Sequence, residues 1–183
     1  MAILKHGVLQ RNDWQSPADD APLPEGAPVI VSLARWQAER DSLVQRNAPV
    51  GVWLRSDQSP VVLAGDLDHV ALVAIEFPKF TDGRGFSYAR MLRDRFGYAG
   101  EIRAVGQVLR DQYLFMIRCG IDAVELPDDV NVQGYLEALG EFSVWYQPAS
   151  DDRTPVVSRR HRRHSGHGSS QVVNESVAAI WAY

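Results

Sequence analysis

The chain has 183 residues, of which 45% are hydrophobic, which is typical of one globular domain with its own core. No apolar run reaches the roughly eighteen residues of a membrane span, and no signal-peptide pattern opens the chain, so we expect a cytoplasmic protein. The single cysteine, Cys119, excludes an internal disulfide and a Cys-x-x-Cys redox pair.

Charge is distributed unevenly along the chain. Residues 1–150 carry fourteen Lys and Arg against twenty Asp and Glu, a net charge of −6, whereas residues 151–183 carry five Arg against three acidic residues, a net charge of +2. The acidic body does not favour nucleic-acid binding.

Composition divides the chain into three regions. Residues 1–28 are predicted to form an N-terminal segment, with a short strand or an edge ribbon followed by a Pro-rich linker. Residues 29–148 have the patterning of an α/β domain. Residues 149–183 are rich in Arg, His, Ser and Gly, which predicts a basic, disordered tail.

Within the middle region, short apolar runs alternate with segments of helical periodicity. The predicted strands are residues 29–33, 50–54, 70–77, 101–105, 122–126 and 142–146. The predicted helices are residues 36–46, 85–97, 108–119 and 130–139, and residues 61–67 fit either a strand or a short helix. In the helix at 85–97 we expect the exposed face to carry Arg90, Arg93, Asp94 and Arg95.

Strands that alternate with helices pair in parallel through right-handed crossovers. We therefore predict a single α/β domain with four to five mostly parallel strands. A partial (βα) barrel is preferred because the strands are short and follow in sequence order, and a flavodoxin-like sheet is the alternative. In both architectures ligands bind at the carboxyl ends of the strands.

The loop after the predicted strand at 70–77 is the first candidate site. Its sequence TDGRG, residues 81–85, places glycines on both sides of Arg84, which would let the backbone approach an anion or a phosphate at a helix start. The alternative is a tight strand-to-helix turn with a surface pair between Asp82 and Arg84. The spacing matches neither the Walker loop nor the dinucleotide fingerprint.

The next strand and helix supply further polar candidates. Arg103 lies between apolar strand neighbours, where an arginine needs a partner or a ligand. Arg110, in a first helical turn, opposes the helix dipole, so either an anion or an ion pair with Glu101 or Asp111 would explain these arginines. The predicted anion site therefore consists of Lys79, Asp82, Arg84, Arg90, Arg103, Gln107, Asp111 and Gln112.

Other titratable residues are given mainly structural roles. Glu76 ends a buried strand. It is either a general acid or base with a raised pKa, or the ion-pair partner of an arginine on a neighbouring strand. Cys119 lies at a helix C-terminus, where a thiolate is not favoured, so it is interpreted as a core residue. His161, His164 and His167 have a metal-like spacing without neighbouring carboxylates, and a solvated tail is preferred to a metal site. No metal site and no catalytic residue are predicted.

A long motif string connects these residues to a known family. The pattern is F-x-D-G-R-G-F-S-x-A-R-x-L-R, then G-Y-x-G-E-I-R-A-x-G, then a D-Q pair and R-x-G. Over about residues 25–148 the chain resembles the bacterial family known as domain of unknown function nine-three-four. The matching positions are Phe80, Asp82 to Ser87, Ala89, Arg90, Leu92, Arg93, Gly97, Tyr98, Gly100 to Ala104, Gly106, Asp111, Gln112, Arg118 and Gly120.

The resemblance implies a role in assimilatory sulfate and sulfite reduction. The family is commonly described as an oxidoreductase involved in sulfite reduction, because its genes lie near those for this pathway. One function is an accessory protein that binds sulfite reductase or another enzyme of sulfate assimilation. The other is an oxidoreductase, or another enzyme, acting on a small anion that bears sulfur or phosphate, with a flavin or nicotinamide cofactor. The chain shows no redox motif of its own, which favours the accessory protein and leaves the cofactor unassigned.

Overall fold

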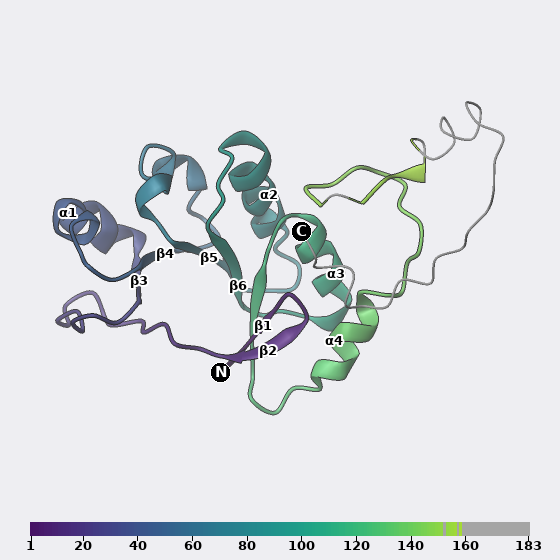
Figure 1. Cartoon of the computed structure of the whole chain (residues 1–183), viewed down its shortest axis with the longest axis horizontal. Coiled ribbons are helices and arrows are strands. Elements are labelled where there is room, and N and C mark those ends of the chain that lie inside the picture. Colours follow the sequence, from purple (N-terminus) through teal and green to yellow (C-terminus); the bar gives the residue numbers. More distant parts are fainter. Residues whose placement is uncertain (152, 157, 159–183) are drawn as a thin grey trace.

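The structure, a computed structural model, describes residues 1–151, 153–156 and 158 (Figure 1). The strands are β1 (Ala2–Lys5), β2 (Val8–Arg11), β3 (Val29–Ser32), β4 (Val50–Leu54), β5 (Leu72–Phe77), β6 (Glu101–Gly106) and β7 (Ala123–Leu126). The helices are α1 (Leu33–Val44), α2 (Arg84–Arg90), α3 (Arg110–Arg118) and α4 (Val132–Ala138). None of the helices in these residues is both long and apolar enough to cross a membrane.

The strands of the described residues form one sheet in the order β2-β1-β7-β6-β5-β4-β3. The five strands from β3 to β7 pair in parallel and lie in sequence order. The prediction of one α/β domain with a mostly parallel sheet is therefore confirmed. A flavodoxin-like sheet reverses its strand order at a switch point. This sheet does not, so its order is that of successive (βα) barrel units.

The helices lie together on one side of the sheet (Figure 1). This follows from the strand order, because right-handed crossovers between successive neighbours all return on the same face. The main core lies between the two layers. Its most deeply buried side chains include Trp36, Val52, Ile75, Leu92, Ala104, Tyr113 and Val124.

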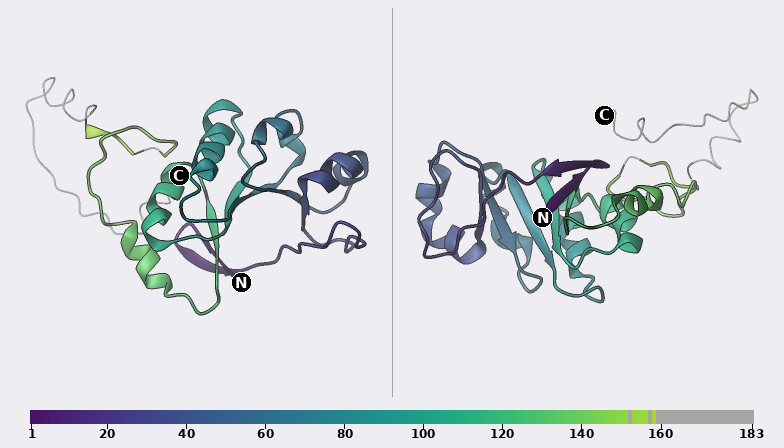
Figure 2. Two further views of the ribbon diagram at one scale, coloured as in Figure 1. Left: turned by 180° about the vertical axis from the view of Figure 1, so that it is seen from behind. Right: turned by 90° about the horizontal axis from the view of Figure 1, so that it is seen from below.

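The opposite face of the sheet is followed by the segment between β2 and β3 (Figures 1 and 2). Its Gln15 forms a parallel bridge with Val29. A smaller cluster of buried side chains from Ile30, Leu72, Ala74 and Val105 packs there against Trp14 and Trp53. The predicted linker that follows contacts arginines in and just after α1, since Arg35 donates to the Ala18 carbonyl at 2.8 Å and Arg46 donates to the Ala27 carbonyl at 2.9 Å.

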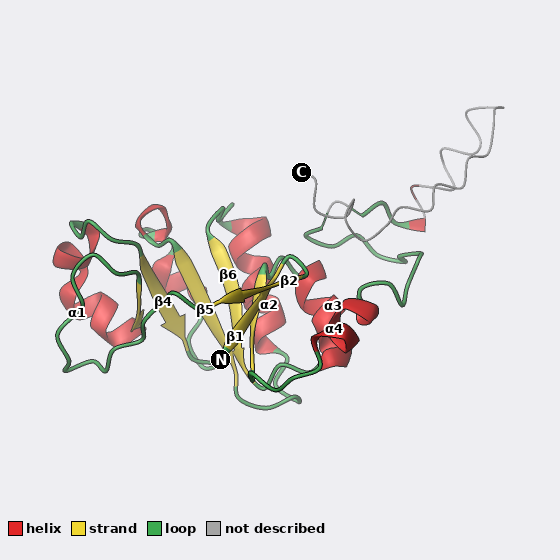
Figure 3. Cartoon of the chain, turned by 60° about the horizontal axis from the view of Figure 1, so that its bottom comes forward, coloured by secondary structure: helices red, strands yellow, loops and turns green. Residues whose placement is uncertain are grey.

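An N-terminal hairpin completes the sheet (Figure 3). Its turn uses His6 and Gly7, both with positive φ, 50° and 74°. Strand β1 pairs antiparallel with β7, so the predicted edge ribbon is confirmed. The strand predicted at residues 142–146 is wrong, since these residues are outside any strand. The edge of β7 at which a further (βα) unit would add its strand is already taken by β1.

One prediction that was left open is decided in favour of a short helix, and another needs correction. The ambiguous residues 61–67 overlap two short 3-10 turns, Pro60–Leu63 and Leu67–His69, instead of a strand. The helix predicted at 85–97 is α2 followed by a π-helix, Met91–Arg95, and it stops where Gly97 adopts a φ of 62°.

Candidate functional site

The carboxyl ends of β4, β5 and β6 lie side by side, as parallel strands require. Side chains and backbone join the three loops that follow. The Gln107 backbone N–H donates to the Phe77 carbonyl at 2.7 Å, Arg84 reaches the loop after β4, and α3 reaches the loop after β5. We call this surface the strand-end rim, and define it by Ser56, Lys79, Phe80, Asp82, Arg84, Gln107, Asp111 and Gln112.

Asp82 and Arg84 form the most ordered charged pair of the rim. Arg84 donates from Nε to Oδ1 at 2.9 Å and from Nη2 to Oδ2 at 2.7 Å, while its backbone N–H also reaches Oδ1 at 3.2 Å. Nη2 donates further to the buried Ser56 hydroxyl at 3.1 Å. These bonds hold the pKa of the Asp82 carboxyl well below its usual range and raise the pKa of the Arg84 guanidinium. The pair is therefore ionised at neutral pH.

One edge of the Arg84 guanidinium remains available. The Asp82 carboxylate holds the Nε and Nη2 edge, and within the described residues no acceptor engages Nη1. The Arg84 side chain is 53% exposed, against 15% for Asp82. The carboxylate thus fixes the orientation of a guanidinium whose outer N–H groups face solvent, and such a fork matches a carboxylate, phosphate or sulfate.

The two glycines of the TDGRG loop have different roles. A Cβ on Gly85 would lie 2.4 Å from the Phe77 ring, which itself packs edge-on against Phe86 at 5.3 Å. A Cβ on Gly83 would meet nothing within 4 Å. Gly85 is therefore needed so that α2 can pack on the end of β5, and the loop has this packing requirement whether or not it binds an anion.

Phe80 and Ser56 are the two residues of the rim that the sequence prediction left out, and Phe80 is the apolar one. Its side chain is 60% exposed although it is apolar. The backbone around it is held on both sides, because Gln112 Nε2 donates to the Phe80 carbonyl at 2.8 Å and the Asp82 N–H donates to the Lys79 carbonyl at 3.0 Å. The Gln112 amide oxygen is buried without a donor among the described residues, which costs about 1–3 kcal/mol.

The remaining predicted residues of the rim are exposed. Lys79, Gln107 and Asp111 all have side chains open to solvent. Arg110, in contrast, is used internally, since it donates to the Gly134 carbonyl at 2.7 Å and pairs with Glu141 at 2.9 Å. The structure explains Arg110 by contacts between α3 and the end of α4, without an anion.

Arg90 and Arg103 lie apart from the rim. Arg90 is about 9 Å further along the helix axis than Arg84 and pairs with Asp94 at 3.0 Å. Arg103 is buried on the helix-free face of the sheet, 2.6 Å from Glu101 and 3.0 Å from Asn12 Oδ1. The structure therefore brings together six of the eight predicted site residues, and the site holds fewer arginines than expected.

The opposite ends of the strands carry a network that the sequence prediction missed. Arg93 points inward from the π-helix and pairs with Asp122 at 2.5 Å. It also donates to the carbonyls of Gly120 at 3.0 Å, Gly100 at 2.9 Å and Tyr98. We call these five residues the basal network. The expected exposed position of Arg93 is corrected, because its side chain is only 18% exposed.

Close packing in the basal network accounts for its glycines. The Tyr98 hydroxyl donates to the Val70 carbonyl at 2.9 Å, and a Cβ on Gly100 would lie 2.2 Å from that hydroxyl oxygen. Gly120 has a φ of 90°, and its Cβ would lie 2.4 Å from Cγ of Arg93. These contacts give the G-Y-x-G and R-x-G parts of the motif string a structural role.

The segment after α4 returns to the end of α3. Arg118 stacks on the Trp145 ring at 4.3 Å and pairs with Asp151 at 3.1 Å, and the Ser150 hydroxyl donates to Asp94 at 2.7 Å. The boundary at residue 149 stays a prediction. The three tail histidines lie outside the described residues, within which no group of three or more His, Cys, Asp or Glu is arranged to hold a metal ion.

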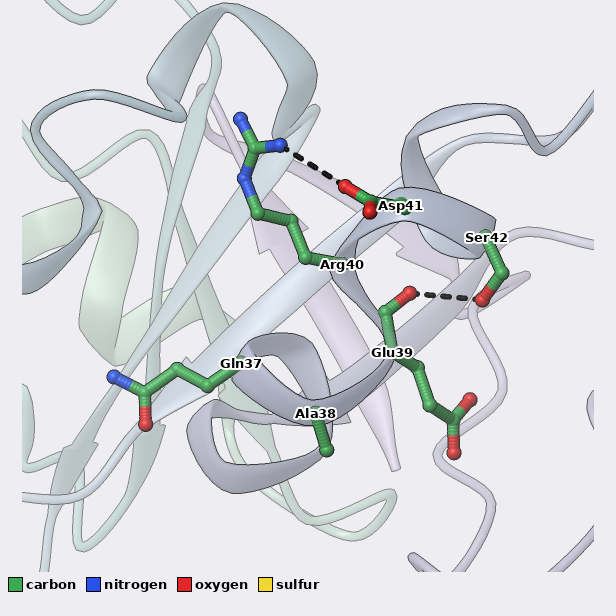
Figure 4. A pocket seen from close by; sticks show the side chains of 6 residues that line it. All are labelled: Gln37, Ala38, Glu39, Arg40, Asp41 and Ser42. Carbon is green, nitrogen blue, oxygen red and sulfur yellow. Dashed lines mark hydrogen bonds and ion pairs between the residues drawn. The ribbon is translucent and has the colours of Figure 1, made fainter.

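A surface hollow lies over α1 and is lined by residues 37–42 (Figure 4). It lies where Glu39 leaves helical geometry, with a φ of −115°, and the Ser42 hydroxyl donates to the Glu39 carbonyl at 2.8 Å. Arg40 at its wall is already bound to Asp66 at 2.6 Å. A single helix forms this hollow, at the far end of the sheet from α3, and it is not part of the rim.

Comparison with protein families gives one match. The family model described as bacterial protein of unknown function (DUF934) matches residues 51–157, more than half of the chain. The chain belongs to this family. The matched region begins in β4 and includes both the strand-end rim and the basal network. No curated protein and no solved structure matches the chain.

Proposed function

We propose that this DUF934 protein is an accessory protein of assimilatory sulfate or sulfite reduction that binds an anionic group at the strand-end rim. The observation that carries the anion site is the half-exposed Arg84 guanidinium, which Asp82 and Ser56 hold by one edge. A pre-oriented donor loses little freedom when it binds, so even one arginine contributes to affinity. Exposed Lys79, in the same turn, adds a second positive charge.

The chemistry of Cys119 supports an accessory role over thiol-based redox catalysis. It is the single cysteine of the chain and is partly buried at the end of α3. Burial raises the pKa of its thiol, which keeps the sulfur protonated and a poor nucleophile at neutral pH. A role in the pathway through binding does not require a reactive thiol.

Calorimetric titration of the purified full chain with sulfite, sulfate and phosphate tests the anion site. We expect Arg84→Gln to weaken anion binding at least tenfold. Arg90→Gln is the matched control, because Arg90 lies on the same helix with 49% of its side chain exposed and in its own ion pair. Equal losses in both variants, or no anion binding by the wild type, would contradict the site.

The accessory role needs a separate measurement. The purified protein should bind purified assimilatory sulfite reductase in a direct assay and change its turnover. The Arg84→Gln variant used in the titration should retain the wild-type fold, because the guanidinium is largely on the surface. A circular dichroism spectrum of the variant checks this. Absence of both binding and an effect on turnover would reject the accessory role, and turnover of sulfite by the isolated chain would replace it with an enzymatic one.

A further inference from the structure

Phe80 lies at the centre of the strand-end rim with its ring in solvent. It occupies the turn that joins β5 to the Asp82–Arg84 pair, and 60% of its side chain is exposed. Exposing a phenyl ring forgoes the favourable free energy of burying it. A loop that needed only to connect β5 to α2 would gain by placing a polar residue here.

The backbone at Phe80 is held by two hydrogen bonds. The Gln112 side chain holds its carbonyl at 2.8 Å, and the turn from the Lys79 carbonyl to the Asp82 N–H closes around it at 3.0 Å. Gln112 makes this bond although its own amide oxygen is left without a donor among the described residues. The backbone that carries the ring is therefore held by a side chain from the first turn of α3 and by a hydrogen bond within its own turn.

The groups around Phe80 combine an aromatic surface with a cation. Arg84, four residues further along at the start of α2, presents the outer edge of a guanidinium that Asp82 and Ser56 orient. Leu109, which is 40% exposed, and the exposed Gln107 lie at the neighbouring end of β6. A bare inorganic anion would use the cation alone and would leave the ring in water.

We propose that the strand-end rim binds an anion carried on a planar ring, a nucleotide or a ring cofactor with a phosphate group, with the ring stacked on Phe80 and the anionic group on Arg84. This inference rests on the proposed anion site and specifies its ligand class. Stacking of a base on an aromatic side chain adds roughly 5- to 150-fold in affinity. Stacking on Phe80 therefore compensates for the weak electrostatic attraction of the anion to Arg84, whose charge Asp82 already neutralises.

Binding of three probes by the full-length protein tests the inference: adenosine monophosphate, flavin mononucleotide and inorganic phosphate. At least one of the two ring ligands should bind tenfold or more tightly than phosphate, and the tighter of the two identifies the ring. Phe80→Ala should remove this advantage and leave phosphate binding unchanged. Arg84→Gln should weaken binding of all three probes.

Two further variants separate stacking from a general loss of structure. Phe80→Tyr keeps an aromatic face and should bind the ring ligand as the wild type does. Phe115→Ala removes a ring of similar exposure, 50%, on the outer face of α3, and should change nothing. Equal affinity for phosphate and both ring ligands would overturn this inference while leaving the anion site intact. No binding of any probe would overturn both.

Discussion

The two ends of the parallel strands differ in how their polar groups are used. At the basal network, Arg93 directs its donors at one carboxylate and three carbonyls within the protein, and its side chain is mostly buried. At the strand-end rim, Arg84 has one edge bound and one edge in solvent, next to an exposed phenyl ring. Both arginines belong to the same motif string, so membership of the motif does not distinguish a structural role from a binding role.

What separates the two regions is the completeness of their hydrogen bonding. A buried polar network that is satisfied within the protein fixes one arrangement of loops. Groups that are held but left partly open are what a ligand site requires, because their orientation is already determined before binding. Single substitutions in the two regions test this distinction.

The largest effect is expected for Arg93→Ala. The substitution leaves Asp122 and the carbonyls of the basal network without their donor, and breaking a largely buried pair in this way costs about 3 kcal/mol or more. Chemical denaturation measures the loss. Arg90→Ala, in the same helical segment but in an exposed pair, should cost at most about 0.5 kcal/mol. Similar losses in the two variants would remove the contrast between buried and exposed arginines.

An intermediate effect is expected for Gly85→Ala at the rim. The added methyl group would meet the Phe77 ring at 2.4 Å, and overpacking of this kind costs about 1–3 kcal/mol. Gly83→Ala, two residues earlier, adds the same group to open space and should leave the denaturation midpoint nearly unchanged. If Gly83→Ala proved the more destabilising variant, the assignment of Gly85 to packing would be wrong.

The smallest effect concerns the pH dependence of the Asp82–Arg84 pair. The pKa of Asp82 is lower in the folded protein than in the unfolded chain, so its stabilisation is present above the unfolded pKa of about 3.9 and is lost as the pH falls towards the folded value. The stabilities of wild type and Asp82→Asn should therefore begin to converge as the pH falls below about 4. A difference that stays constant from pH 7 to pH 2, measured by thermal unfolding, would show that the pair carries no such linkage.

The fold was predictable because its patterns are local. The apolar run at β4 and the alternation of strands with helices fixed the parallel sheet and placed the TDGRG loop at a strand end. The position of β1 was not predictable in the same way, because nothing near residues 2–5 indicates a partner at β7. The failed strand at 142–146 has the same cause, since its apolar pattern does not reveal that the edge of β7 is already occupied.

The site was predictable only in part. Strand periodicity shows that Arg103 and Ile102 face opposite sides, but it does not show which side bears the helices, so Arg103 was assigned to the wrong region of the sheet. Arg93 was assigned to the exposed face, although a regular helical count places it about 40° from the buried Ala89, on the side that faces the sheet. Phe80 was not predicted as a site residue, because an apolar side chain usually indicates a position in the hydrophobic core. The available signal was its position in a polar loop, outside both the strand and the helix periodicity.

The pairing of β1 with β7 has a consequence for how the chain comes to fold. Strand β1 cannot pair with β7 until residues 123–126 have been made, whereas each parallel strand from β4 onward finds its predecessor already present. Contacts between such distant segments form slowly. The hairpin of β1 and β2 therefore pairs with β7 late, and it occupies the edge at which another (βα) unit would add its strand. A nascent chain that lacks it exposes the edge of β7 to pairing with other chains.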